Sequence, residues 1–214
     1  MRIALVEDHL FVRDVLRLAC GRDFGHEIVA EAAEGAAAIP LLMAAEPDLL
    51  VLDLHLPDRD GLEVLDEVRS RRPLQRALIL SSRCDPYTVH RIGRAGVCGF
   101  IDKGSHSLAM IGAALAAIAE GRRYFSPAFV ALRAACRRDP RSFDKLLSER
   151  EQSVLVWLCR SGSDREISSR LGIAPETVEK HRSNLRRKLG LHSTAELLRY
   201  ARAQGFAIPE PAAP

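Results

Sequence analysis

Short apolar runs alternate with longer amphipathic stretches through the first half of the chain. Continuous apolar runs of this length are typical of strands in a parallel sheet that helices cover on both faces. The intervening stretches repeat apolar residues every three or four positions, as helices do. The pattern therefore predicts an α/β fold, a doubly wound parallel sheet built from five strand–helix units. The expected strands are Arg2–Val6, Glu27–Ala30, Leu49–Leu52, Ala77–Leu80 and Cys98–Ile101, and the expected helices are Leu10–Cys20, Gly35–Glu46, Leu62–Ser70, Pro86–Ala95 and Ser107–Glu120. Pro40 lies inside the second of these helices and is expected to kink or delay it.

Polar, proline-punctuated sequence follows Gly121, and no strand pattern returns after Leu147. We therefore expect a linker at residues 122–145, between a first domain at residues 1–121 and a separate all-α domain of four helices at residues 146–208. Three of its helix starts carry a serine followed three residues later by glutamate, which is the capping-box signature. The pairs are Ser148/Glu151, Ser163/Glu166 and Ser193/Glu196, and the expected helices are Glu149–Arg160, Asp164–Leu171, Pro175–Leu189 and Thr194–Gln204.

Composition and charge narrow the functional classes. Of the 214 residues, 47% are hydrophobic and 28% are charged, which is close to the globular average. No apolar run approaches the ~20 residues that cross a bilayer, and the start of the chain turns acidic too early for a signal peptide, so we expect a cytoplasmic protein. The five cysteines are too widely spaced for a disulfide framework or a zinc cluster and are expected to be free thiols.

The net charge of +3 is unevenly distributed along the chain. Residues 1–120 contain 13 basic and 18 acidic residues and carry −5, whereas residues 121–140 and 141–214 carry +4 each. An acidic first half and a basic second half indicate separate roles. The second half is better suited to bind a polyanion such as DNA.

Residues with distinctive chemistry follow four of the predicted strands. They are Glu7 and Asp8 after the first strand, Asp53 after the third, Ser81 after the fourth and Lys103 after the fifth. Ligands of an open parallel sheet gather beyond the carboxyl ends of its strands. Carboxylates that converge there repel one another unless a cation holds them, and oxygen ligands suit Mg²⁺. The set predicts a magnesium site in which Asp53 attacks a phosphoryl group, while Lys103 and Ser81 stabilise the phosphoryl oxygens.

Each of these residues also has a simpler interpretation when it is taken alone. Asp8 could cap the first helix, Asp53 could belong to a turn, and Lys103 could be an ordinary surface lysine. Their joint placement at the ends of the appropriate strands favours the functional interpretation.

Residues 1–120 resemble a two-component receiver domain. The resemblance rests on Val6-Glu7-Asp8-His9, on the segment DLHLPDRDG from Asp53 to Gly61, on Ile79-Leu80-Ser81-Ser82 and on the segment GFIDK from Gly99 to Lys103. It implies that a cognate sensor histidine kinase phosphorylates Asp53, with Mg²⁺ held by Glu7, Asp8, Asp53 and the backbone carbonyl of His55. It also implies that Ser81 and Phe100 form a switch pair, in which the hydroxyl moves toward the phosphoryl group and the ring turns into the vacated space.

The helix expected at Pro175–Leu189 follows a short turn, Gly172-Ile173-Ala174, as in a helix-turn-helix motif. Most charged helix faces are merely solvated, so its basic polar side alone is weak support for nucleic-acid binding. Glu179 could accept a hydrogen bond from cytosine N4 or simply point away from the DNA. The residues placed to contact a major groove or its phosphates are Thr177, Glu179, Lys180, His181, Arg182, Asn184, Arg187 and Lys188.

The second half is similar to the DNA-binding domain of NarL/LuxR-type regulators. The similarity rests on the segment LSERE from Leu147 to Glu151, on Glu166-Ile167, on TVEKH from Thr177 to His181 and on Lys188-Leu189-Gly190. It implies that the third helix reads bases and that the fourth, with Leu197, Leu198 and Ala201, serves in packing or in dimer pairing. Together the two resemblances predict a response regulator that is not an enzyme, forms a homodimer when phosphorylated and binds promoter DNA.

Two other functions stay open from the sequence. An aspartyl-phosphate phosphatase or phosphotransferase would use the same nucleophile, but such enzymes generally place a second Asp two residues later, where this chain has His55. A pseudo-receiver would bind DNA without phosphorylation, but it usually lacks the acceptor aspartate or the lysine. Both Asp53 and Lys103 are present.

Overall fold

The computed structural model describes residues 1–104, 107–160 and 163–207. The chain divides into two compact units. Among the described residues, the first unit contains Met1–Cys84 and Arg91–Ala131, and the second unit contains Asp85–His90 and those from Leu132 to Ala207. Ile208, the last residue of the predicted second domain, lies outside the described residues. In the described ranges, no helix combines the length and the hydropathy that crossing a membrane requires.

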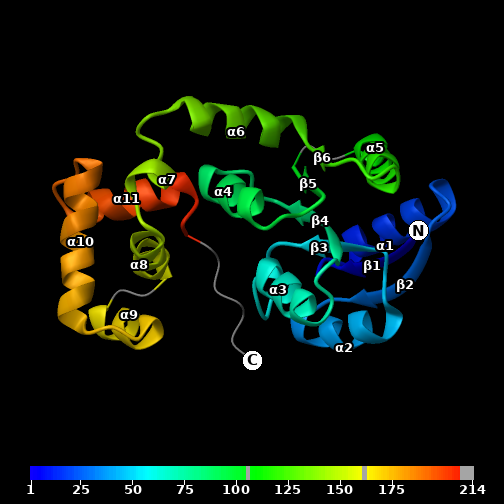
Figure 1. Cartoon of the computed structure of the whole chain (residues 1–214), viewed down its shortest axis with the longest axis horizontal. Coiled ribbons are helices and arrows are strands. Elements are labelled where there is room, and N and C mark those ends of the chain that lie inside the picture. The colour runs from blue at the N-terminus through cyan, green and yellow to red at the C-terminus, as the bar shows by residue number, and fades with distance from the viewer. Residues whose placement is uncertain (105–106, 161–162, 208–214) are drawn as a thin grey trace. The chain divides into compact units, whose positions relative to one another are not determined.

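A six-stranded, fully parallel sheet forms the centre of the first unit (Figure 1). Its strands are β1 (Arg2–Val6), β2 (Glu27–Ala32), β3 (Leu49–Asp53), β4 (Arg76–Ser81), β5 (Gly99–Asp102) and β6 (Tyr124–Phe125). The spatial order is β2-β1-β3-β4-β5-β6. The parallel α/β prediction is confirmed, but β6 lies where a linker was predicted. A two-residue strand carries too little alternation to be recognised in a sequence.

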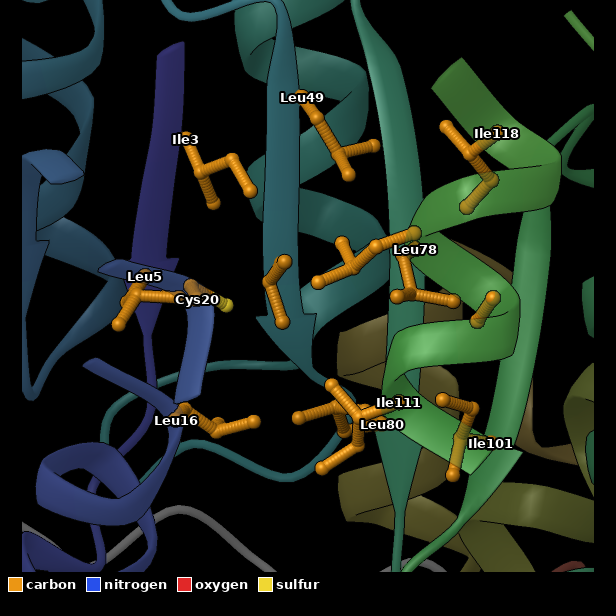
Figure 2. Packing of buried hydrophobic residues seen from close by; sticks show 13 residues of the cluster. Ile3, Leu5, Leu16, Cys20, Leu49, Leu78, Leu80, Ile101, Ile111 and Ile118 are labelled. Atoms are coloured by element: carbon orange, nitrogen blue, oxygen red, sulfur yellow. The ribbon is translucent and has the colours of Figure 1, made fainter. Parts of the chain in front are cut away.

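Helices fill the connections between the strands. They are α1 (Leu10–Leu18), the π-helical turn η1 (Ala19–Asp23), α2 (Gly35–Ala45), α3 (Gly61–Arg71), α4 (Pro86–Arg94) and α5 (Leu108–Ala119). Alternate strand residues pack against α1 and α5 in one apolar cluster, which includes Leu16 of α1, Ile111 and Ile118 of α5, and the strand residues Leu80 and Ile101 (Figure 2). Side chains alternate along a strand, so the intervening residues, such as Leu50 and Ile79, point to the other face. Both faces are therefore apolar, as the continuous hydrophobic runs predict.

Pro40 neither interrupts α2 nor delays its start, contrary to the expected delay. A proline inside a helix removes the hydrogen bond to the carbonyl four residues earlier, which is that of Ala36. Both Pro40 and Ala36 are exposed, so water can satisfy this carbonyl. The helix begins at Gly35, as predicted, and runs to Ala45.

The segment predicted to be a linker contains two helices as well as β6. They are α6 (Pro127–Arg138) and α7 (Phe143–Leu146). Pro127, one of the prolines that suggested a connector, is instead the first residue of α6. The missing N–H of proline costs nothing at this position.

The second unit contains α8 (Glu149–Arg160), α9 (Asp164–Leu171), α10 (Pro175–Leu189) and α11 (Thr194–Gln204), with the bounds predicted from the sequence. All three predicted serines cap their helices by accepting a backbone N–H of the glutamate three residues on. The reciprocal bond, in which the backbone N–H of the capping serine donates to the glutamate carboxylate, forms at Ser148/Glu151. Glu166 instead accepts from the Ser163 hydroxyl, and Glu196 accepts from the backbone N–H of His192.

Candidate functional site

Acidic and basic side chains converge at the carboxyl ends of the strands in the first unit. Glu7 follows β1, Asp53 ends β3, Ser81 ends β4, and Lys103 follows β5. Because these strands are parallel and adjacent, their last residues share one edge of the sheet. Glu7 and Asp53 are only 1% and 3% exposed, respectively, and Ser81 is fully buried. Two carboxylates at this depth require a charged or hydrogen-bonding partner.

Lys103 is that partner. Its ammonium Nζ lies 2.7 Å from Glu7 Oε2 and 2.8 Å from Asp53 Oδ2. The backbone N–H of His55 donates to the other Asp53 oxygen, Oδ1, at 3.2 Å. The ammonium thus bridges two carboxylates that come from separate strands.

The environment of Glu7 differs from that of a surface glutamate. Burial raises the pKa of Glu7, and the hydrogen bond from Lys103 lowers it, while the negative charge of Asp53 raises it again. The net effect is a pKa above the ordinary value. A cation added to this site would favour the ionised form of Glu7.

The site can accommodate a metal ion. One possible ligand atom from each of Glu7, Asp8, His9 and Asp53 lies within 4.8 Å of the others. Carboxylate oxygens are the ligands that Mg²⁺ prefers, so the three acidic residues fit this ion. His9 was not predicted to be a site residue. It is largely exposed, and its Nδ1 lies 2.8 Å from Asp8 Oδ1, so it orients that carboxylate. Its position directly after Asp8 was the only signal in the sequence.

Ser81 and His55 approach each other beside Asp53. The Ser81 hydroxyl accepts from the backbone N–H of Arg83 at 3.0 Å, and its Oγ lies 3.5 Å from the Nδ1 atom of His55. Burial lowers the pKa of the His55 imidazole below its ordinary value, so the ring is neutral at pH 7. Phe100, the predicted partner of Ser81, is fully buried on the neighbouring strand β5.

The loop between β3 and α3 is held close to Asp53. A Cβ atom at Gly61 would collide with the carbonyl oxygen of Asp53, so only glycine permits this approach. Asp60 caps α3 by accepting from the backbone N–H of Leu62 at 2.9 Å, and the same oxygen lies 2.5 Å from Arg91 of α4. Asp60 and Arg91 were not identified from the sequence, because nothing in the spacing of residues 60 and 91 indicates their contact.

The predicted groove-reading residues lie on α10 of the second unit. Val178 and Leu185 are buried in the helical core and fix which side of α10 faces outward. The outward side includes Glu179, Lys180, Arg187 and Lys188, which are exposed, whereas Thr177, His181, Arg182 and Asn184 are half-buried. Ser183 is also exposed on this side and was not identified from the sequence, because serine carries no charge signal.

Several of these side chains already have partners within the second unit. Arg182 forms ion pairs with Asp164 of α9 and with Glu179, and Arg186 lies 3.7 Å from Glu179. The Lys188 ammonium lies 2.8 Å from the buried carboxylate of Glu151 in α8. Arg182 and Lys188 therefore contribute to holding α10 against its neighbouring helices.

In α11, Leu197 and Ala201 are fully buried in the core of the second unit, and Leu198 is half-buried. These residues were predicted to serve in packing or in dimer pairing, and the structure shows Leu197 and Ala201 in core packing.

Replacing Glu151 with glutamine should lower the free energy of unfolding of the second unit by about 1–2 kcal/mol near pH 7. Burial raises the pKa of Glu151, but hydrogen bonds from Lys188 and Ser148 hold it below the ordinary value of 4.5. The stabilisation is thus present above pH 4.5 and is lost as the pH falls through the folded-state pKa. Urea unfolding followed by the fluorescence of Trp157, the single tryptophan, measures this difference. If the difference in unfolding free energy between Glu151→Gln and the wild type stays constant down to pH 3, the proposed ion pair is contradicted.

Comparison with known proteins agrees with both halves of the structure. Residues 3–114 match the family described as "Response regulator receiver domain". Residues 145–201 match the family described as "Bacterial regulatory proteins, luxR family". The first match contains every residue of the acidic site, and the second contains α8 to α10 and most of α11.

Curated relatives match this chain over nearly its whole length. The transcriptional regulatory protein UhpA of Escherichia coli (strain K12) is 32% identical over 197 residues, covering 92% of this chain and 95% of UhpA. The probable transcriptional regulatory protein NarL of Mycobacterium tuberculosis is 32% identical over 205 residues, covering 95% and 94%. The structure of RcsB from Salmonella enterica bound to a promoter with the phosphomimetic BeF₃⁻ superposes with a TM-score of 0.67, covering 95% of this chain and 98% of RcsB at 21% identity, which indicates a shared fold. The chain belongs to the LuxR-type response regulators, transcription regulators in which a receiver domain precedes a helix-turn-helix DNA-binding domain.

Proposed function

We propose that a sensor histidine kinase phosphorylates this regulator on Asp53 in a Mg²⁺-dependent reaction, and that the phosphorylated chain forms a homodimer on promoter DNA. The observation that carries the proposal is the ammonium of Lys103, which bridges the buried carboxylates of Glu7 and Asp53 at the edge of the sheet. This geometry supplies a carboxylate nucleophile and a fixed cation within one small site. A cation placed there stabilises the negative charge of a transferring phosphoryl group.

The proposed transfer is an in-line displacement at phosphorus. A carboxylate oxygen of Asp53 forms the new O–P bond as the N–P bond to the donor's phosphohistidine breaks. The electron pair of that N–P bond returns to the imidazole nitrogen. Lys103 and the hydroxyl of Ser81 donate to the phosphoryl oxygens, and the backbone N–H of His55 orients the Asp53 carboxylate.

A bound Mg²⁺ supplies additional positive charge at the phosphoryl oxygens. We propose Glu7, Asp8, Asp53 and the backbone carbonyl of His55 as its protein ligands. The clustering of the acidic side chains of Glu7, Asp8 and Asp53 supports this assignment. Glu7, whose pKa is raised in the absence of the ion, ionises more readily when the ion binds.

Incubation with acetyl phosphate and Mg²⁺, followed by intact mass measurement and a phosphate assay, tests the proposal. We expect one phosphoryl group per chain, located on Asp53, with little release of free phosphate. Continuous turnover to phosphate would indicate a phosphatase. No reaction at all would indicate a receiver that mediates protein contacts without phosphorylation.

The donor protein needs a surface beside Asp53 on which to dock. Helix α1 exposes three large apolar side chains, those of Leu10, Phe11 and Leu18, of which Phe11 is 79% exposed. Phe11 also lines a small hollow between α1 and α5 that reaches Lys103. We therefore assign α1 as the surface that receives the kinase, because apolar side chains exposed next to a reactive site indicate a protein partner.

Replacing Phe11 with glutamate should reduce the rate of phosphotransfer from a histidine kinase that phosphorylates the wild type by about tenfold. Phosphorylation by acetyl phosphate should keep its wild-type rate, because a small donor needs no docking surface. Phosphotransfer from the kinase and from acetyl phosphate is measured by the rate of radiolabel incorporation. Leu74→Glu is the matched control, since Leu74 is 93% exposed in the loop that precedes β4, at the opposite edge of the sheet. Equal slowing with both donors would place Phe11 in the chemistry and not in docking.

For DNA, we propose that α10 lies in the major groove. The exposed, basic side of α10 supports this proposal, with Lys180 and Arg187 placed for base or phosphate contacts and Ser183 added to the predicted set. Thr177, His181 and Asn184 flank this side. Glu179, Arg182 and Lys188 can reach DNA only by exchanging the ion pairs that they form within the second unit.

We further propose that two chains bind two half-sites about one helical turn apart. A homodimer places two copies of α10 on one face of the duplex, so its site should be an inverted or direct repeat. Selection of binding sequences from a random pool, with and without acetyl phosphate, measures the spacing.

A further inference from the structure

The start of helix α6 packs on the first unit through the buried side chain of Phe129. Phe129 is the only buried residue among the twelve residues of α6, all of which the structure describes. Its ring lies 5.0 Å from the ring of Phe100 and 4.9 Å from the ring of Phe125, measured between centroids. Phe125 belongs to β6, which pairs with β5 beside Phe100. The start of α6 therefore packs on the aromatic ring that β5 contributes.

Phe100 is also a neighbour of the Asp53 site. In the parallel pairing of β4 with β5, Ile79 lies opposite Phe100 and Ser81 lies opposite Asp102. Side chains alternate along a strand, so Ser81 and Phe100 point to the same face, two positions apart on adjacent strands. The ring of Phe100 thus neighbours the Ser81 hydroxyl on the adjacent strand β4, and it also packs against the ring of Phe129.

The turn before α6 contains a second unusual group. The backbone N–H of Ser126 donates to the carbonyl of Phe100 at 2.9 Å, and the Ser126 carbonyl accepts from the N–H of Val130. Ser126 is fully buried, yet its hydroxyl has no hydrogen-bond partner among the described residues. A buried, unpartnered hydroxyl is costly, so the first turn of α6 has a hydrogen bond to gain if it rearranges.

From these contacts we propose that Phe129 is the residue through which α6 responds to the position of Phe100. The inference rests on the proposed phosphorylation of Asp53. When the Phe100 ring turns toward Ser81, Phe129 loses one of its two aromatic packing partners, and the first turn of α6 loosens. Because α6 begins in the first unit and continues along the chain into the second, this turn carries the change toward the DNA-binding domain.

Coupling between two sites is reciprocal, so Phe129 must in turn affect the Asp53 site. The position of Phe100 seen here is the one that Phe129 stabilises. Removing the Phe129 ring makes it easier for Phe100 to turn, and this favours the phosphoryl-bound state. A purely structural role for Phe129 would have no such effect on the affinity of a site on another strand.

The test measures the affinity of the full chain for beryllofluoride with Mg²⁺, a non-covalent phosphoryl analogue, by ¹⁹F NMR. Phe129→Ala should bind it about fivefold more tightly than the wild type, and Phe129→Leu, which keeps part of the apolar contact, should show a smaller gain. Val130→Ala is the matched control, because Val130 is the next residue of α6 and is exposed. It should bind with wild-type affinity.

Hydrogen exchange of the wild type supplies a measurement that needs no variant. In the peptide spanning residues 124–131, amide exchange should increase about tenfold when beryllofluoride binds, because the loss of an aromatic contact shifts the opening equilibrium by about that factor. In Phe129→Ala the exchange should already be fast without the analogue.

The outcomes separate this inference from the proposed function. If the wild type neither binds beryllofluoride nor accepts a phosphoryl group, the proposed function fails, and this inference fails with it. If the wild type binds the analogue but exchange at residues 124–131 is unchanged and all Phe129 variants bind equally well, the coupling through Phe129 is refuted while the proposed function stands.

Discussion

Replacing Lys103 with methionine should lower the free energy of unfolding of the first unit by about 3 kcal/mol at pH 7.5. The ammonium bridges Glu7 and Asp53, which are almost completely buried, and methionine leaves both carboxylates without their cation. Breaking a buried ion pair from one side is among the most destabilising single changes, because the remaining charge cannot reach water. Urea unfolding followed by circular dichroism measures the loss.

The destabilisation caused by Lys103→Met should depend on pH and on Mg²⁺. The pKa of Glu7 is already raised by burial, and it rises further without Lys103. The folded state then binds a proton that the unfolded chain releases, so the loss of stability is greatest at high pH and shrinks as the pH falls toward 5. Mg²⁺ should restore part of the stability.

Lys180→Met is the matched control for Lys103→Met, because Lys180 is an exposed lysine of α10. It should unfold like the wild type. A destabilisation of Lys103→Met that is equal at pH 5 and pH 7.5 would rule out a charge-bridging role for Lys103.

Replacing Asp53 with asparagine should abolish phosphorylation by acetyl phosphate completely. An amide oxygen is not nucleophilic enough to form the acyl phosphate, although the single carbonyl oxygen of asparagine can still accept a hydrogen bond from Lys103. The fold should therefore be retained. We expect the wild type to bind its DNA sites at least about tenfold more tightly when it is phosphorylated, and Asp53→Asn to show no change on addition of the donor.

Asp66→Asn is the control for this experiment, because Asp66 is an exposed carboxylate on α3 of the same unit. It should take up one phosphoryl group and should respond like the wild type. Mass measurement and fluorescence anisotropy with labelled DNA follow the two steps separately. An Asp53→Asn variant that gains DNA affinity with acetyl phosphate would disprove Asp53 as the origin of the response.

Local signals were sufficient for most of the fold. The apolar runs that became β1 to β5 are continuous because helices cover both faces of the sheet. Such a run can be recognised from a short stretch of sequence alone. The serine–glutamate pairs marked three helix starts because a cap depends on residues three positions apart. By contrast, β6 and the first turn of α6 exist through contacts with Phe100, about 25 residues earlier, and no local pattern encodes such a contact.

The acidic site could be anticipated because sheet topology alone brings the ends of parallel strands together. The partners that position it could not, since Asp60 meets Arg91 across a loop and a helix. On α10, the polar side was visible from the spacing, but whether a charge faces solvent or a neighbouring helix was not. Lys188 is the clearest example, because Glu151 lies 37 positions earlier in the sequence.

The two sides of α10 have different freedom to change in evolution. Val178, Leu185 and the Lys188–Glu151 pair tie one side to the rest of its unit, whereas Lys180 and Ser183 are exposed on the other side. Substitutions at these open positions leave the scaffold intact. A duplicated copy of the gene could thus acquire new target promoters through a few surface changes while keeping its stability, and the same positions are where a designer would begin to reprogram it.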